Sequence, residues 1–349
     1  MDKLLKVENL YVSYHTYAGE VHSVRGVSFD LTEGETLAVV GESGCGKSVT
    51  AKAILGLNSA SNMEIKKESK IFYQGKNILD YSDKELRTYR GEDCAIIFQD
   101  ALASLNPTMT IGKQIAEKLR LHKNMAKKEA LEEAVKLLQA VGIPNAVKRS
   151  GQYPHEFSGG MRQRVMIAIA FACSPKLLIA DEPTTALDVT IQAQIMDLLK
   201  RMRKEQNTAV ILITHDLGVV ANTADRIMVM YCGKIIEYGS SKDIFYRPRH
   251  PYTIALLKAV PRLDFINKQE LFSIPGAPPD LIAPPKGCPF AARCGYCMEI
   301  CQEAEPEYSD FKDGHFAACW LHHVIAPQEG NPFAVADQIH GYRQNGGVI

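Results

Sequence analysis

The stretch GESGCGKS, residues 41–48, constrains the fold of this chain more than any other part of its sequence. It follows a short β-branched run, TLAVV (36–40), and leads into GKSVTAKAILGL (46–57), which has helical character. Glycines on such a strand-to-helix turn let backbone N–H groups face a polyphosphate, and the helix N-terminus adds a favourable dipole. The pattern G-x-x-x-x-G-K-[ST] in this context predicts a nucleotide phosphate loop.

Individual residues of this phosphate loop have expected roles. Lys47 is expected to reach the β- and γ-phosphates, and the hydroxyl of Ser48 is expected to bind Mg²⁺. The loop residues assigned to nucleotide binding are Gly41, Ser43, Gly44, Cys45, Gly46, Lys47, Ser48 and Val49. A glycine-rich turn without a ligand is the alternative, and the strand–loop–helix context disfavours it.

Two further apolar runs are typical of parallel strands that are buried on both faces, KLLIAD (176–181) and AVILITHD (209–216). The first leads into an acidic pair, Asp181 and Glu182. At a strand end beside a phosphate loop, Asp181 can lie near Mg²⁺ and Glu182 can face the γ-phosphate, where it polarises a water. The sequence therefore predicts an α/β fold around a parallel sheet with a hydrolytic nucleotide site.

The remaining sequence has two regions that differ in pattern and composition. Between about residues 100 and 165 the helical pattern dominates, notably in KKEALEEAVKLLQAVG (127–142), so we expect a helical subdomain inserted into the α/β core. After about residue 240 the composition changes, and six prolines in residues 273–290 predict an extended connection. A chain of 349 residues fits one large domain and a smaller one.

The segment EFSGGMRQR (156–164) resembles the signature of the ATPase subunits of ABC transporters, in which Ser-Gly-Gly opens a helix about 20 residues before the acidic strand. The common form is Leu-Ser-Gly-Gly-Gln, and this chain has Phe157 and Met161 at the outer positions. The resemblance implies that this helix N-terminus meets the γ-phosphate held by another subunit. The phosphate-facing residues would be Ser158, Gly159 and Gly160.

The same resemblance implies roles for four further residues. Gln99 in IIFQD is similar to the glutamine that contacts Mg²⁺ and the attacking water and begins the segment that meets a transmembrane subunit. Asp188 in TTALD resembles an aspartate that crosses the dimer interface, and His215 in LITHD resembles a histidine that contacts the γ-phosphate. Tyr14 resembles the aromatic residue that stacks on adenine, although Tyr17 lies three residues away and either could be ordinary packing. Glu182, His215 and Gln99 form the expected catalytic set, with Ser48, Gln99 and Asp181 around Mg²⁺.

The C-terminal part resembles the extension of dipeptide and oligopeptide importer ATPases. The segments that carry this resemblance are RPRHPYTIALLKAVP (247–261) and GCPFAARC (287–294). We therefore expect a nucleotide-binding domain at 1–240 and a small cysteine-rich extension at 241–349. The resemblance implies import of peptides, with nickel, glutathione or oligosaccharides as alternative cargo.

Five cysteines lie within 32 residues of this extension, at positions 288, 294, 297, 301 and 319. A segment with little hydrophobic core of its own usually needs a cross-link to stay folded. Inside a cell, a bound metal can provide that cross-link. Only Cys294 and Cys297 form the short paired arm that zinc sites use, whereas iron–sulfur clusters tolerate uneven spacing. The resemblance implies a [4Fe–4S] cluster on Cys288, Cys294, Cys301 and Cys319, with Cys297 as a possible substitute. Zn²⁺ and unligated thiols are the alternatives.

Charge and hydropathy bear on location and partners. Lys+Arg and Asp+Glu both number 40, so no net field attracts nucleic acid, and we expect no nucleic-acid partner. A soluble ABC ATPase of DNA repair is therefore the less favoured alternative. The N-terminus has no apolar segment of a secretory signal, and the longest apolar run, 165–173, is too short to span a bilayer.

The resemblance implies a peripheral protein at the cytoplasmic face of the cell membrane. Its expected cofactors are ATP and Mg²⁺. Its expected partners are two transmembrane permease subunits and a paralogous ATPase subunit, with an extracytoplasmic substrate-binding protein acting indirectly.

Overall fold

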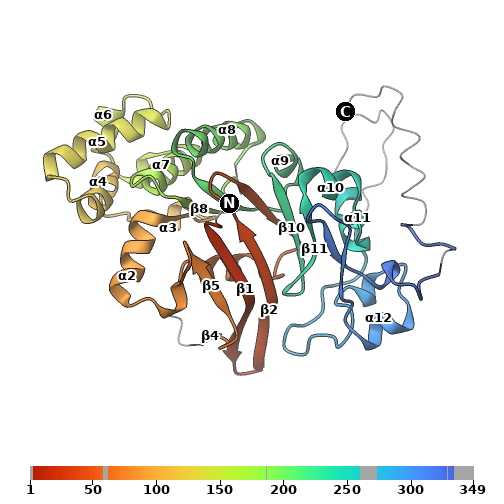
Figure 1. Cartoon of the computed structure of the whole chain (residues 1–349). Helices are drawn as coiled ribbons and strands as arrows, with labels where there is room; N and C mark the ends of the chain where they lie inside the picture. Colours follow the sequence, from red (N-terminus) through yellow and green to blue (C-terminus); the bar gives the residue numbers. More distant parts are fainter. Residues whose placement is uncertain (1–2, 58–61, 186, 260–272, 328, 334–349) are drawn as a thin grey trace, which may run out of the picture.

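The computed structural model of the chain describes residues 3–57, 62–185, 187–259, 273–327 and 329–333, in which the strands form two sheets (Figure 1). The larger sheet contains, in spatial order, β12 (Tyr308–Asp310), β13 (Phe316–Ala318), β11 (Lys234–Ser240), β10 (Arg226–Tyr231), β3 (Thr36–Val40), β9 (Ala209–Ile213), β8 (Leu177–Asp181) and β7 (Cys94–Ile97). The smaller, antiparallel sheet contains β2 (Gly19–Leu31), β1 (Leu5–Thr16), β5 (Lys70–Tyr73) and β6 (Lys76–Asn77), with β4 (Met63–Ile65) also paired to β1.

The centre of the larger sheet is parallel, as its apolar runs predict. In the order β10, β3, β9, β8 and β7, each strand pairs in parallel with the next, whereas β10 and β11 pair antiparallel, and every residue of β3 and β9 is buried. Successive side chains of β3 enter different apolar clusters, Leu37 and Val39 in one, Ala38 and Val40 in another. Strands covered on both faces carry continuous apolar runs for this reason. The predicted α/β fold around a parallel sheet is confirmed.

Helices cover both faces of this sheet. The α-helices are α1 (Lys47–Ile54), α2 (Asp83–Thr88), α3 (Ala101–Ser104), α4 (Ile111–His122), α5 (Lys127–Ala140), α6 (Ala146–Arg149), α7 (Gly159–Phe171), α8 (Val189–Gln206), α9 (Leu217–Ala221), α10 (Ser241–Tyr246), α11 (Pro251–Lys258) and α12 (Glu299–Glu303). Short helical turns are η1 (Ile78–Asp80), η2 (Tyr89–Asp93, a π-helix), η3 (Pro154–Glu156), η4 (Ala291–Arg293) and η5 (Trp320–His322).

The region between residues 100 and 165 is helical, as predicted, and contains α3 to α6 and the first half of α7. Ile115 and Leu119 of α4 and Leu138 of α5 are fully or almost fully buried. They belong to the same apolar cluster as Leu178 of β8, so the helices rest on one end of the sheet. This spacing of buried residues is the helical periodicity that the sequence shows.

The C-terminal region, defined here as residues 241–333, adds to the larger sheet. β13 pairs antiparallel with β11, placing Ala317 opposite Glu237, and β12 pairs with β13. Residues 273–290, called the linker below, form neither helix nor strand, as their six prolines predict. In Figure 1 the yellow helices α4–α6 and the blue C-terminal region lie at opposite ends of the molecule.

Within the described part of the chain, none of the helices combines the length and the apolar character that crossing a bilayer requires.

Candidate active site

The candidate site lies at the carboxyl ends of four neighbouring parallel strands. The phosphate loop follows β3, Gln99 follows β7, Asp181 ends β8 and His215 follows β9. The register aligns these ends, because Ile213 of β9 lies opposite both Val39 of β3 and Asp181 of β8. The carboxyl edge of an open parallel sheet is where ligands bind in α/β folds.

The phosphate loop depends on its glycines for steric reasons. Gly41 and Gly46 have φ of 151° and 99°, values that residues with a Cβ rarely adopt. A Cβ would lie 2.2 Å from the carbonyl oxygen of Met230 at Gly41, and 2.4 Å from that of Ser23 at Gly46. The loop is therefore packed directly against the backbones of β10 and β2.

Lys47 is buried within the loop, with 7% of its surface exposed. Its ammonium donates to the carbonyl oxygens of Gly41, at 2.7 Å, and Glu42, at 2.8 Å. Burial raises the pKa of the neighbouring Cys45 thiol, although the Lys47 charge opposes the shift. The positive charge expected to meet phosphates is thus centred on the loop itself.

Ser48 and Asp181 come together although they are far apart in the sequence. The Ser48 hydroxyl donates to Oδ1 of Asp181 at 3.0 Å. Burial raises the pKa of the Asp181 carboxyl, the nearby Glu182 acts in the same direction, and the hydrogen bond from Ser48 opposes them. A hydroxyl beside a carboxylate offers the hard oxygen ligands that Mg²⁺ prefers, so these residues fit that ion.

Glu182 is held by three side chains. Nε2 of Gln99 and Oγ1 of Thr185 each donate to Oε2 of Glu182 at 2.9 Å, and Nδ1 of His215 lies 3.4 Å from Oε1. The Glu182 backbone has φ of 47°, the left-handed region, and its N–H donates to Ile213 at 2.9 Å. The predicted catalytic set, Glu182, Gln99 and His215, therefore forms one cluster.

The Ser-Gly-Gly segment lies at the start of α7. Ser158 caps this helix by accepting a hydrogen bond from the N–H of Met161, and Ser158 and Gly159 are exposed. A Cβ on Gly160 would lie 2.8 Å from Cγ2 of Ile191, so α7 packs closely on α8. Within the residues the structure describes, no hydrogen bond or ion pair joins this segment to the phosphate loop.

Asp188 and Tyr14 occupy other parts of the surface. Asp188 caps α8 by accepting a hydrogen bond from Ile191 at 2.9 Å, and it is exposed. Tyr14 is half-buried on β1, paired with Val21 of β2 and Met63 of β4, whereas Tyr17 is fully exposed at the hairpin end. Neither Asp188 nor Tyr14 hydrogen-bonds to the Glu182 cluster within the described residues.

Comparison with known proteins adds to this geometry. The model of the ABC transporter family matches residues 24–185, and that of the C-terminal region of oligopeptide/dipeptide transporters matches residues 236–301. The dipeptide transport ATP-binding protein DppD of Bacillus subtilis is 55% identical, over 92% of this chain and 95% of its own length. The oligopeptide transport ATP-binding protein OppD of Escherichia coli is 53% identical, over 91% and 93%. The chain belongs to the ATP-binding subunits of ABC transporters.

Solved structures agree with this assignment of the chain as an ABC ATPase. A dimeric ATP-binding cassette bound to ADP and phosphate has a TM-score of 0.61 and 27% identity, covering 68% of this chain and 98% of its own. The protein cbiO1 of Clostridium perfringens, part of an ABC transporter complex, has a TM-score of 0.60 and 29% identity, covering 71% and 92%. The ABC ATPase fold with a phosphate loop is therefore established.

The ABC ATPase has site residues that the sequence analysis missed. Thr185 binds Glu182, and its place three residues after the acidic pair in a turn could have indicated this contact. Glu42 of the phosphate loop binds Arg293 of the C-terminal region. No local pattern could reveal that pair, because 251 residues separate its members.

The cysteines of the ABC ATPase do gather, but not as a metal site. Cys288, Cys294, Cys301 and Cys319 line a cavity of about 10 Å³, and Cys297 does not. That volume corresponds to about one water molecule. Burial raises the pKa of Cys288 to about 12 and of Cys294 to about 11, because a buried thiolate is poorly solvated.

The prediction of an iron–sulfur cluster at Cys288, Cys294, Cys301 and Cys319 is therefore wrong. Among the described residues, the potential metal-ligating group whose donor atoms all lie within 4.8 Å of one another is His15, Glu20 and Glu64, with no cysteine in it. The names of the similar peptide-transport proteins describe ATP-binding transport proteins and mention no cluster. The same 4.8 Å limit speaks against zinc. Four sulfurs bound to one tetrahedral zinc ion would lie within that distance of one another. The cysteine-containing segment, residues 288–319, is stabilised by apolar packing instead of metal ligation, since Phe290 and Leu321 are buried beside the cysteines.

Cys45, Cys94, Cys173 and Cys232, the scattered cysteines, are buried free thiols.

Proposed function

We propose that this ABC ATPase binds MgATP at the phosphate loop, hydrolyses it, and thereby energises import of dipeptides or oligopeptides across the cytoplasmic membrane. The observation that carries the hydrolytic part is the Glu182 carboxylate, which Gln99, Thr185 and His215 surround beside the Ser48–Asp181 pair. The peptide cargo is supported by relatives named as dipeptide and oligopeptide transport proteins, similar over more than nine-tenths of the chain. These relatives favour peptides over nickel, glutathione or oligosaccharides, and transport over DNA repair.

Each residue has a defined part in this mechanism. Lys47 meets the β- and γ-phosphates, while the loop amides follow the phosphate chain. Ser48, Asp181 and Gln99 would hold Mg²⁺, and the bound ion would offset the charge on the phosphates. Glu182 accepts a proton from the attacking water, and the hydrogen bond from Gln99 keeps its carboxylate oriented. His215, whose side chain is largely exposed, contacts the γ-phosphate.

The complete site needs a second subunit. Ser158, Gly159 and Asp188 are exposed, and within the described residues the first two have no bond to the phosphate loop of their own chain. An exposed helix N-terminus is suited to a phosphate presented from outside. We infer a head-to-tail pair with a paralogous ATPase, in which α7 of each subunit closes the site of the other. The similarity to a solved cassette described as dimeric supports this arrangement.

Work is transferred to two permease subunits through the helical end of the molecule. A groove of about 890 Å³ lies there, and its lining includes Ser104, Asn106, Met109 and Leu121. Gln99 begins the segment that leads into this groove. A movement of Gln99 when the γ-phosphate is cleaved can therefore shift the residues of the docking surface that follow it in the chain. The subunit would thus be peripheral at the cytoplasmic face, with an extracytoplasmic binding protein delivering the peptide to the permeases.

We also propose the division of the chain at about residue 240, supported by the change of composition there. The two parts are not separate sheets, since β13 pairs with β11.

Peptide uptake into membrane vesicles that contain the permeases, the paralogous ATPase and this chain tests the proposal. ATP-dependent uptake of a labelled di- or oligopeptide is expected, and Lys47→Ala in this chain should reduce it strongly. Uptake that is equally fast without this chain would contradict the proposal.

A further inference from the structure

We propose that the linker completes the ATP site from the C-terminal region: Pro278, Pro279 and Leu281 form the second wall of a pocket for the nucleoside of ATP, and Arg293 fixes this wall to the phosphate loop. This inference rests on the proposed function, because it assumes that ATP binds at residues 41–48.

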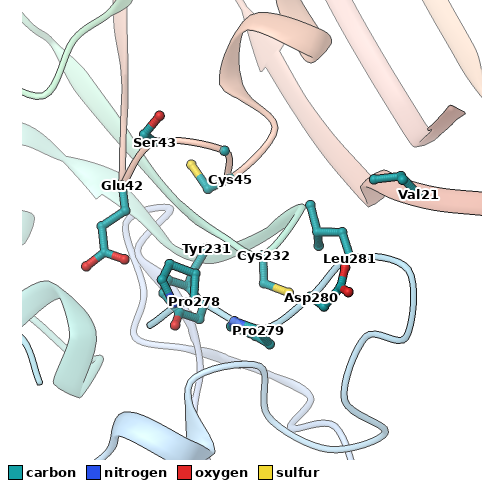
Figure 2. A pocket seen from close by; sticks show the side chains of 11 residues that line it. Val21, Glu42, Ser43, Cys45, Tyr231, Cys232, Pro278, Pro279, Asp280 and Leu281 are labelled. Carbon is teal, nitrogen blue, oxygen red and sulfur yellow. The ribbon is translucent and has the colours of Figure 1, made fainter. Parts of the chain in front are cut away.

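The pocket lies between the phosphate loop and the linker. Figure 2 shows Ser43 and Cys45 of the loop on one side and Pro279 and Leu281 of the linker on the other. Its volume is about 300 Å³, at the lower end of the range of about 300–1,000 Å³ that is usual for small-molecule sites. Most of its surface is apolar, and its polar lining residues include Ser43 of the loop and Asp280 of the linker.

The nucleoside of ATP is the occupant that these surroundings favour. A nucleotide whose phosphates lie on the loop amides must carry its ribose and base away over the rim of the loop, and Ser43 and Cys45 belong to that rim. Val21 also lines the pocket, and it is the direct partner of Tyr14 in the β1–β2 hairpin, the residue expected to stack on adenine. Proline rings and a leucine side chain are flat or apolar surfaces suited to a base or ribose.

The linker is held as a fixed wall by its contacts with β2. The carbonyl oxygen of Leu281 accepts a hydrogen bond from the N–H of His22 at 2.9 Å. Next to it, the N–H of Ile282 donates to Oδ1 of Asp280 at 2.9 Å, which fixes the turn. Ile282 also lies against the hairpin, since its Cγ2 is 3.2 Å from the position of a Cβ on Gly19.

Arg293 joins the start of the linker to the loop. Its guanidinium donates to the carboxylate of Glu42 at 2.6 and 3.0 Å, and also to the carbonyl oxygens of Pro275 at 2.8 Å and Ile274 at 3.3 Å. Only 5% of the Arg293 side chain is exposed. A buried guanidinium that binds both oxygens of one carboxylate fixes orientation as well as distance.

A second contact from the C-terminal region holds the same loop residue. The hydroxyl of Tyr252 on α11 accepts a hydrogen bond from the N–H of Glu42 at 2.8 Å. The backbone and the side chain of Glu42 are therefore both engaged by residues more than 200 positions later. Arg293 is thus a positioning residue: it acts through Glu42 and the linker and not on the nucleotide.

Two ligands separate the wall from the phosphate loop, MgATP and magnesium tripolyphosphate, which lacks the nucleoside. Leu281→Ala in the full chain is expected to raise the Kd for MgATP about three- to tenfold and to leave the Kd for tripolyphosphate within about twofold of wild type. Pro279→Ser, at a half-buried position, should give the same pattern and replaces Leu281→Ala if that variant is unfolded by circular dichroism. Leu281→Met, which keeps an apolar side chain of similar volume, should bind MgATP with a Kd close to that of wild type.

Arg293→Gln tests the positioning role in the assembled transporter. It is expected to raise the KM for ATP with little change in kcat, and Arg293→Lys should not restore KM, because one ammonium cannot bind both Glu42 oxygens. Glu305→Gln is the matched control: Glu305 also ties the C-terminal region to the core, through Arg25 and Lys234, but it is not part of the pocket lining. This control should leave both the KM for ATP and kcat unchanged.

Unchanged MgATP affinity in Leu281→Ala and Pro279→Ser would overturn the inference, and so would an equal loss for MgATP and tripolyphosphate. A kcat effect of Arg293→Gln without a KM effect would overturn the role of Arg293. Failure of the underlying ATP site is distinguishable, because Lys47→Ala would then leave the binding of both ligands intact.

Discussion

Glu182, the proposed general base, shows at the scale of one residue how this fold fixes the position of a carboxylate. Its backbone is left-handed, a conformation that costs about 1–3 kcal/mol for a residue with a side chain. Hydrogen bonds from Gln99 and Thr185 to one carboxylate oxygen, and the bond from its N–H to Ile213, offset this strain. Strain retained beside a phosphate loop is expected where orientation matters for function.

Glu182→Gln should bind MgATP and lose turnover by about 10²–10⁴-fold, since the amide keeps the shape of the side chain and cannot accept the proton of water. ATP hydrolysis by the assembled transporter measures turnover, and gel filtration with ATP should detect trapped closed dimers. Thr185→Val provides a control that removes one hydrogen bond to the same carboxylate and should cost much less. Wild-type turnover in Glu182→Gln would exclude Glu182 as the base.

At the scale of elements, the exposed start of α7 is the surface that we propose meets a second subunit. Ser158 caps the helix and leaves its N-terminal end exposed. Close packing of Gly160 on Ile191 of α8 fixes the direction in which this end points. The start of α7 is therefore packed against α8 on one side and exposed to solvent on the other.

Ser158→Arg should abolish ATP-dependent association with the paralogous ATPase, because the bulky cation fills the place of the γ-phosphate from the other subunit. The Kd of the isolated chain for MgATP should change by less than about twofold. Light scattering with and without ATP measures association. Ser82→Arg is the matched control, since Ser82 is also an exposed serine that caps a helix, α2. Ser82→Arg should associate as wild type does, and ATP-dependent association that persists in Ser158→Arg would contradict the composite site.

The groove at the helical end gives a second prediction at this scale. Leu121, with 69% of its surface exposed, is an apolar residue of its mixed polar and apolar lining. Leu121→Glu should reduce peptide uptake at least about fivefold with no change in MgATP affinity, because it puts a charge at an apolar position of the docking surface. Val147→Glu, at another exposed apolar position on α6, outside the groove lining, should have no effect on uptake. Equal effects of the two variants would refute docking at the groove.

The whole molecule is tied together through the C-terminal region, in which His250 is a buried junction. Nδ1 of His250 accepts a hydrogen bond from the backbone N–H of Tyr252 at the start of α11, and the backbone N–H of His250 donates to the carboxylate of Glu237 of β11. Burial lowers the pKa of His250 to about 3, so it stays neutral in the folded chain. The unfolded chain binds a proton there below a pH of about 6.5.

Folding of this region should therefore weaken as the pH falls from about 6.5 towards 3, by up to about 1.4 kcal/mol per pH unit from His250. His250→Asn keeps a cap for α11 and removes the titrating group, so its loss of stability between pH 6.5 and 5 should be smaller than that of wild type. Urea unfolding followed by the fluorescence of Trp320, the single tryptophan, measures this difference. A parallel pH dependence in both proteins would refute the prediction.

The sequence by itself determined the nucleotide-binding core, because the relevant signals are local. The strand–loop–helix around Lys47, the acidic pair after β8 and the histidine after β9 each lie within a few residues of a buried strand. Parallel strands bring their carboxyl ends to one edge of the sheet, so the sequence alone predicts that these separate local motifs form one site.

Only the tertiary structure decided what the C-terminal region does. The grouping of five cysteines predicted a metal site, but the direction and separation of their side chains depend on packing, and the packed thiols leave a cavity of about 10 Å³. The contacts of Arg293 with Glu42, and of Leu281 with His22, join segments more than 250 residues apart. Such contacts follow from how β11, β13 and the linker fold back over β2 and β10, a long-range arrangement that no local periodicity encodes.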